Sequence, residues 1–218
     1  MDWDPVVQKI KADLDARNAA REDALKICRQ VIRTSSNAIR AVHRNEADKA
    51  RTLIGEAGAF VREARAITEH EHPELYAAGF VHDSQKEYAE AVVTFALIQN
   101  EPIPDPDELG VEYPAYLNGV GEAVGELRRH ILDIIREDQV ARSDELLNAM
   151  DDIYYLLVSF DYPDALTGGL RRTTDAARAI MERTRGDLTT ALRQKKLKQA
   201  ISDLEEKIAG IAPPALPL

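Results

Sequence analysis

The first 45 residues constrain the fold more than any other part of the chain. After Asp4 and Pro5, neither glycine nor proline occurs until beyond about Asn45. Apolar residues recur there at helical spacing, at Val7, Ile10, Leu14, Leu25, Cys28, Ile32, Ile39 and Val42. This pattern predicts one helix of about 40 residues, with Asp4 as its N-cap and Pro5 in its first position.

The remaining sequence predicts six more helices and no strands, which makes the fold class all-α. The expected helices span 46–70, 74–100, 115–138, 143–160, 170–185 and 189–210. Four prolines fall between residues 101 and 114, so that segment is a connector and not helix interior. Gly186 is expected to end the sixth helix. We expect one helical domain over residues 1–210 and an unstructured tail over 211–218.

Composition narrows the class of protein. The chain has 218 residues, of which 44% are hydrophobic and 30% charged, as expected for a soluble, helix-rich protein. We find neither a membrane span nor a secretion signal, and we therefore expect a cytoplasmic protein without a membrane partner. A single cysteine, Cys28, excludes an internal disulfide and a cysteine-based zinc cluster. No P-loop motif is present, which excludes a P-loop NTPase.

Charge is unevenly distributed along the chain. The net charge is −10, but residues 1–45 hold nine Lys and Arg against six Asp and Glu, a net charge of +3 that leaves −13 for the rest. Five of these basic residues form one stripe on the first helix: Lys26, Arg29, Arg33, Arg40 and Arg44. On an isolated helix, such a stripe would be read as an ordinary solvated face.

Two pairs of glutamates stand out in the middle of the chain. Glu87 and Glu90 project to the same side of the third predicted helix, with Asp83 one turn earlier. Glu122 and Glu126 share one face of the fourth. On spacing alone, a solvated acidic face is the ordinary interpretation of the first pair.

Three glycines lie beside the second pair of glutamates. Gly119, Gly121 and Gly125 each cost about 1 kcal/mol relative to alanine in a helix, and close approach of another helix or of a ligand usually compensates. If the third and fourth helices pack antiparallel across the connector, the two glutamate pairs can converge.

Four converging carboxylates would repel one another unless a cation lay among them. Oxygen ligands select magnesium, manganese or calcium, and magnesium shares its coordination with substrate phosphates. The chemistry indicated is phosphodiester or phosphoanhydride hydrolysis by a metal-activated water. His70 and His72 lie on different helix faces and are interpreted as surface or helix-end residues.

Five segments in order resemble the translin family, in particular its archaeal members related to translin-associated factor X (TRAX). They are "DLDARNAARE", "QKEYAEAV", "YLNGVGEAVGELRR", "DDIYYLLVSF" and "MERTRGD". The resemblance implies a seven-helix bundle that assembles into a hollow homo-octamer with nucleic acid at its inner surface. TRAX-like members resemble magnesium-dependent RNases.

The resemblance also assigns candidate site residues. The TRAX Glu-x-x-Glu pair falls on Glu87 and Glu90, and the further two acids fall on Glu122 and Glu126. These four become candidate catalytic and metal-binding residues for Mg²⁺, with Mn²⁺ as a possible substitute. Position 122 carries Glu where TRAX subunits carry Asp, which places the carboxylate one methylene further out. In such an assembly, the basic stripe could contact RNA or single-stranded nucleic acid through its phosphates.

Three functions therefore compete. The leading one is a magnesium-dependent endoribonuclease within a homo-oligomer. The second is a translin-like protein that binds RNA or single-stranded DNA without catalysis. The third is an all-α nucleoside-triphosphate pyrophosphohydrolase, because that class also places Glu-x-x-Glu pairs and magnesium on helices.

Overall fold

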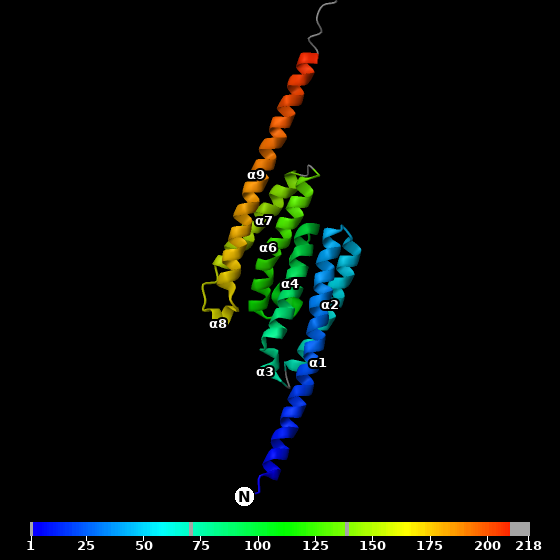
Figure 1. The fold of residues 1–218 in the computed structure, drawn as a ribbon, viewed down its shortest axis with the longest axis vertical. Helices are drawn as coiled ribbons and strands as arrows, with labels where there is room; N and C mark the ends of the chain where they lie inside the picture. The colour runs from blue at the N-terminus through cyan, green and yellow to red at the C-terminus, as the bar shows by residue number, and fades with distance from the viewer. Residues whose placement is uncertain (1, 70–71, 138–139, 210–218) are drawn as a thin grey trace, which may run out of the picture.

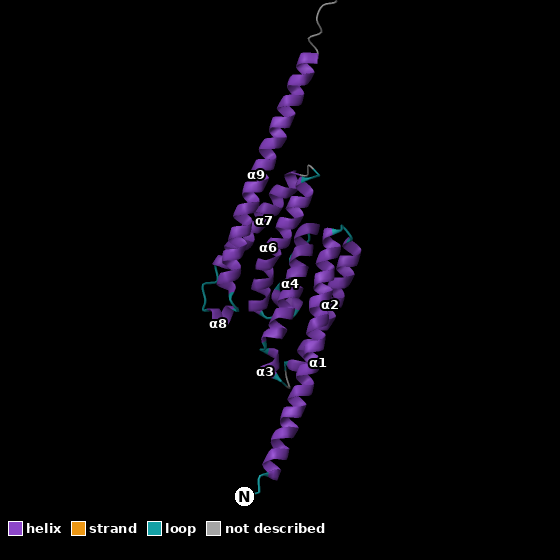
Figure 2. Ribbon diagram, viewed as in Figure 1, coloured by secondary structure: helices purple, strands orange, loops and turns teal. Residues whose placement is uncertain are grey.

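The structure, a computed structural model, describes residues 2–69, 72–137 and 140–209. All regular secondary structure in these residues is helical (Figure 2), and the all-α class is confirmed. The long helices are α1 (Asp4–His43), α2 (Ala47–Thr68), α4 (Gly79–Gln99), α6 (Tyr113–Ile135), α7 (Val140–Val158) and α9 (Leu170–Ala209). Three one-turn helices lie between them: α3 (Pro73–Tyr76), α5 (Pro106–Leu109) and α8 (Asp164–Thr167). No helix of the described residues is both long and apolar enough to span a bilayer.

The long helices pack side by side into an elongated bundle. In Figure 1, α1 and α2 lie on one side, α4 and α6 in the middle, and α7 and α9 on the other side. The largest apolar core lies among α4, α6, α7 and α9, and smaller cores lie between α4 and the α1–α2 pair. The first turns of α1 and the last turns of α9 extend beyond the bundle at opposite ends (Figure 1).

Helices α4 and α6 pack in parallel, so the antiparallel arrangement expected from the sequence is wrong. Near the start of both helices, the backbone N–H of Glu112 donates to the side chain of Gln85, and near their ends Ile98 and Ile134 line the same cavity. The connector therefore runs back along the bundle. Leu109 and Val111 anchor it there, because both are buried in a core with α1, α2 and α4.

Two of the three glycines in α6 allow this close packing. A Cβ on Gly119 would lie 2.6 Å from the carbonyl oxygen of Lys86 and 2.9 Å from the backbone nitrogen of Glu90, so α4 passes directly against this position. A Cβ on Gly121 would collide with Thr173 of α9. Gly125 faces open space. The close approach predicted from the glycines is thus confirmed for the first two and wrong for Gly125.

Gly186 does not end a helix, and the sixth and seventh predicted helices are one continuous helix, α9. Contacts on both sides of the glycine hold α9 to the bundle. Arg185 pairs with Asp151 of α7 at 2.5 Å, and Asp187 pairs with Arg128 of α6 at 2.8 Å. One glycine costs about 1 kcal/mol in a helix, which such neighbouring contacts offset.

Other predicted helix boundaries shift for local reasons. Helix α1 begins at Asp4 rather than after it, and Trp3 is its N-cap without a side-chain hydrogen bond. The third predicted helix is split into α3 and α4, because Ala78 is extended. The connector contains α5, which begins with a capping box between Asp105 and Glu108. His70 and the predicted tail 211–218 lie outside the described residues.

Candidate functional site: a cluster of glutamates between α4 and α6

The structure brings three of the four predicted site glutamates together. Glu87 and Glu90 come from α4 and Glu122 from α6, and one carboxylate oxygen of each lies within 4.8 Å of the others. The parallel packing at Gly119 positions them, since it places the α6 acid directly across from the α4 pair. All three are half-buried. Within the described residues, this is the one group with the spacing of a metal site.

Burial and mutual repulsion perturb the α4 pair. Burial, followed by the charges of Glu87, Glu122 and Glu126, raises the pKa of Glu90 to about 8. Burial also raises the pKa of Glu87, and the charges of Glu122 and Asp83 add to that effect, against an opposing effect of Lys86. Without a cation, Glu90 therefore holds a proton at neutral pH.

Lys86 supplies one positive charge to this cluster. Its ammonium donates a hydrogen bond to Glu122 Oε1 at 2.7 Å. Burial lowers the pKa of Lys86, but the hydrogen bond and the charges of the neighbouring acids outweigh this, and the net pKa is raised. No sequence pattern singled out Lys86. Its position next to Glu87 placed it on the same turn, but only the packing of α6 shows which acid it meets.

The fourth predicted residue, Glu126, is turned to a different partner. Nε2 of His43, the last residue of α1, lies 2.5 Å from Glu126 Oε2, and Arg129 lies 3.9 Å from the same oxygen. The hydrogen bond to His43 lowers the pKa of Glu126, against an opposing effect of burial. Glu126 is close enough to raise the pKa of Glu90 but is not among the three clustered acids.

An open cavity of about 600 Å³ adjoins the cluster. Glu90, Glu122 and Lys86 line it, together with Arg172 and Thr173 of α9. Arg172 is exposed and makes no ion pair with any described residue. The cavity lining therefore includes both carboxylates and a guanidinium, a set of groups suited to a phosphate ester with a bound cation.

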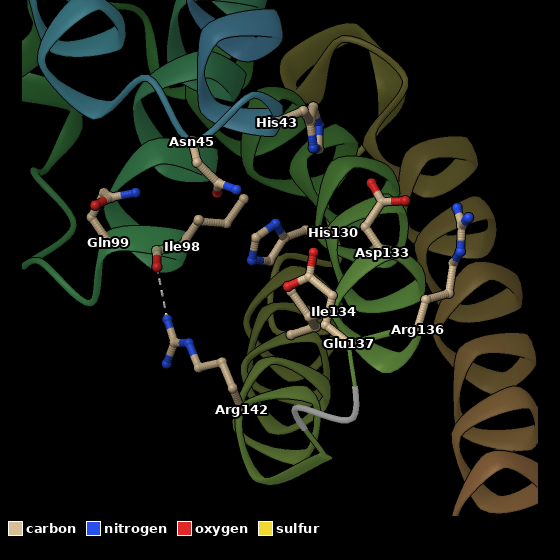
Figure 3. Close-up of a pocket in the computed structure, with 10 residues that line it drawn as sticks. All are labelled: His43, Asn45, Ile98, Gln99, His130, Asp133, Ile134, Arg136, Glu137 and Arg142. Carbon is tan, nitrogen blue, oxygen red and sulfur yellow. Dashed lines mark hydrogen bonds between the residues drawn. The ribbon is translucent and has the colours of Figure 1, made fainter.

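A second cavity, of about 620 Å³, lies beyond His43 (Figure 3). His43 and His130 of α6 both line it, with ring centroids 6.4 Å apart. On its lower side, Arg142 donates to the backbone carbonyl of Ile98 at the end of α4. His43 thus both lines this cavity and contacts Glu126.

The other predicted residues lie away from the glutamates. Nδ1 of His72 lies 3.7 Å from Oε1 of Glu74 in α3, and His72 is not among the clustered residues. The basic stripe, Lys26, Arg29, Arg33, Arg40 and Arg44, is exposed along α1. None of the five makes an ion pair with a described residue, and Arg40 bonds only to the neutral side chain of Asn37. Cys28 is buried in a core with Ile27, Ala64 and Val81.

The arrangement of helices closely matches a solved structure. The crystal structure of AfC3PO, a member of the translin and TRAX family, superimposes with a TM-score of 0.80 and 31% sequence identity. The match covers 86% of this chain and 97% of that chain. The chain belongs to the translin family.

Other comparisons cover a similar share of this chain. A structure of AfC3PO in complex with duplex RNA has a TM-score of 0.77 at 29% identity, and the crystal structure of apo-NeC3PO has the same score at 18% identity, which shows the fold alone. Each match covers 86% of this chain and 97% of the other. MJ0175 of Methanocaldococcus jannaschii, an uncharacterised protein, is 27% identical over 191 residues, which are 87% of this chain and 84% of that protein. No protein-family model matches the chain.

Proposed function

We propose that this translin-family protein is a metal-dependent endoribonuclease. One observation carries the proposal, namely that Glu87, Glu90 and Glu122 lie within 4.8 Å of one another in a partly buried position beside an open cavity. Acidic residues with a purely structural role are normally held apart or paired with basic residues. Here the three carboxylates lie close together, and the pKa of Glu90 is raised to about 8. A titratable group perturbed this strongly beside a cavity is typical of a functional site.

The donor set fits a hard divalent cation. Three carboxylates without thiol or imidazole favour magnesium or manganese. Glu87, Glu90 and Glu122 would hold the ion, and binding would release the proton from Glu90. Such an ion supplies positive charge for the phosphodiester and lowers the pKa of water. Arg172, which lines the same cavity, would bind a non-bridging phosphate oxygen.

RNA is the proposed substrate. AfC3PO, 29% identical to this chain in that complex, has been solved with duplex RNA. The basic stripe of α1 supports the same choice, because its exposed side chains lack acidic partners among the described residues and are free to contact phosphates. Contacts of this kind bind the backbone without reading sequence.

A binding protein without catalysis is the second candidate. Lys86 favours it, because its ammonium already neutralises part of the charge of the cluster through Glu122. If the positive charge of Lys86 is enough to offset the repulsion among the carboxylates, the cluster needs no metal. The two candidates differ in whether the purified protein binds Mn²⁺ at these glutamates.

We also propose that the protein forms a homo-oligomer, which the resemblance puts at eight subunits. Exposed apolar residues on the extended ends of α1 and α9 support assembly: Trp3, Val7, Ile10 and Leu14 on α1, and Leu197, Ile201, Leu204 and Ile208 on α9. Light scattering at micromolar concentration should give a mass that is a multiple of 24.3 kDa. A monomer would contradict assembly.

The test of catalysis is cleavage of labelled single-stranded and duplex RNA with Mg²⁺ or Mn²⁺, with free nucleoside triphosphates as competing substrates. Glu87→Gln is expected to abolish RNA cleavage and to leave RNA binding unchanged. Glu56→Gln on α2 is the control, because that glutamate is exposed and has no ion pair with a described residue. If the wild-type protein binds RNA but cleaves nothing, the second candidate replaces the first. Hydrolysis of nucleotides alone would instead indicate a pyrophosphohydrolase.

A further inference from the structure

The four glutamates at the α4–α6 interface are not equivalent. Glu87, Glu90 and Glu122 approach one another, but Glu126 is bonded to His43 instead. Glu126 lies one turn after Glu122 on the same face of α6, and its charge acts on Glu90. A glutamate this close to a carboxylate cluster could rotate toward a bound cation at little cost. In this structure a specific contact holds it elsewhere.

His43 is well suited to hold Glu126. Its side chain is only 3% exposed, and it is fixed at the last residue of α1. A carboxylate can only accept hydrogen bonds when ionised, so the hydrogen of the contact lies on Nε2 of His43. The other ring nitrogen, Nδ1, is buried without a hydrogen-bond partner among the described residues. Among the described residues, the contact with Glu126 is therefore the hydrogen bond that the His43 ring makes.

We propose that His43 is a positioning residue that keeps the Glu126 carboxylate apart from the three clustered glutamates, so that Glu126 serves as the base for the attacking water. The inference rests on the proposed function. Glu126 accepts one proton from water while the water oxygen bonds to phosphorus. The bond from phosphorus to the leaving ribose oxygen breaks, and that oxygen takes a proton from solvent water.

The two roles require different environments, which the structure provides. The pKa of Glu126 is lowered by its hydrogen bond with His43, so this carboxylate is ionised and able to accept a proton. Glu87, Glu90 and Glu122 instead face one another, with one carboxylate oxygen of each within 4.8 Å of the others, as ligands of a single cation would.

The test compares His43→Leu with His43→Gln. Leucine removes the donor, whereas the glutamine amide can donate an N–H from nearly the same place as Nε2. In His43→Leu, kcat for RNA should fall at least 10-fold with KM within twofold. Without RNA, its affinity for Mn²⁺, measured by calorimetry, should rise severalfold, because Glu126 is free to join the cluster. His43→Gln should restore most of both properties.

His130→Leu is the matched control. This histidine lines the same cavity as His43 but does not contact Glu126, so neither kcat nor Mn²⁺ affinity should change. In a Glu126→Gln background, His43→Leu should have no further effect on kcat. If His43→Leu does not fold, as judged by circular dichroism, the comparison of His43→Gln with Glu126→Gln decides: the former should remain active and the latter should not.

Unchanged Mn²⁺ affinity and unchanged kcat in folded His43→Leu would overturn the inference. So would a His43→Gln variant as impaired as His43→Leu, since shape and not the donated hydrogen bond would then matter. If the wild-type protein cleaves no RNA, the proposed function fails. In that case, the Mn²⁺ affinities still show whether His43 holds Glu126 away from the cluster.

Discussion

The glutamate cluster and the basic stripe of α1 are both rows of like charges at helical spacing, but the fold treats them in opposite ways. The cluster is packed between α4 and α6, where burial and repulsion raise the pKa of Glu90 to about 8. The stripe is exposed to solvent and screened by it. Packing that removes like charges from water thus shifts their pKa values. Outside the core, they contribute a field for attracting partners.

Neutralising Glu90, the acid with the most strongly raised pKa in the cluster, should have the largest effect. Glu90→Gln should abolish Mn²⁺ binding and reduce RNA cleavage by roughly 100-fold or more, because one ligand and its charge are lost. Calorimetry and single-turnover cleavage would measure the two effects. A variant that binds Mn²⁺ like the wild-type protein would show that this acid is not a ligand.

The same substitution tests the raised pKa directly. In metal-free wild-type protein, Glu90 keeps its proton up to about pH 8 when folded but releases it near the ordinary pKa of 4.5 when unfolded. The free energy of unfolding should therefore fall as the pH rises from about 4.5 to 8. Glu90→Gln should remove much of this slope in urea titrations with a chelator present. An equal slope in both proteins would contradict the burial effect.

Neutralising the stripe should affect binding and leave the cluster intact. The triple variant Arg29→Gln, Arg33→Gln and Arg40→Gln should weaken RNA binding by roughly 10- to 100-fold at moderate salt, and reduce the slope of log K against log salt by about 2 to 3. Arg171→Gln and Arg183→Gln, exposed on α9, provide the control. Mn²⁺ affinity should be unchanged. RNA binding equal to that of wild type would identify the stripe as merely solvated.

The packing that creates the cluster can be tested by adding one methyl group. Gly119→Ala should destabilise the protein by about 1–3 kcal/mol and weaken Mn²⁺ binding, because the new Cβ would force α4 from α6. Gly125→Ala, on the same helix but facing open space, should stabilise the protein by about 0.5–1 kcal/mol. Thermal unfolding of the two variants gives the comparison. Equal effects would mean that close approach at Gly119 is unimportant.

The smallest expected effect comes from Glu122→Asp. The shorter side chain restores the acid found in TRAX subunits, keeps the charge, and lengthens the distance to Lys86, so cleavage should stay within a few-fold of wild type or rise. Glu122→Ala should abolish cleavage. The measurement is kcat at saturating Mg²⁺ for the wild-type protein, Glu122→Asp and Glu122→Ala. Loss of activity in Glu122→Asp would indicate that this site requires the longer side chain.

The sequence predicted what depends on local pattern. Helix periodicity predicted the all-α class and the approximate positions of the long helices, except that it divided α9 in two at Gly186. Helical spacing placed Glu87 and Glu90 on one side of α4. The glycines of α6 indicated close packing, because a glycine in a helix is costly unless something approaches it. A neighbouring backbone does contact α6 at Gly119, as this cost predicts. Gly125 faces open space, so a glycine within a helix does not by itself indicate close packing.

The sequence did not predict features that depend on the relative placement of distant segments. The direction of α6 relative to α4 depends on how the connector packs, and its residues Leu109 and Val111 are buried against distant helices. The partner of Glu126 comes from α1, 83 residues away, so no local pattern could select His43. Gly186 indicated a helix end, but α9 continues through it. Ion pairs with other helices hold α9 in place on both sides of the glycine.

The exposed first turns of α1 also provide an optical reporter. The chain has a single tryptophan, Trp3, and its side chain is 61% exposed on the part of α1 that extends beyond the bundle. Because no other indole contributes, tryptophan fluorescence reports on the surroundings of this segment alone. A red-shifted emission that moves to shorter wavelength as the protein is concentrated would show that another surface covers Trp3. The emission would thereby distinguish covering of the α1 end from events at the glutamates without any added label.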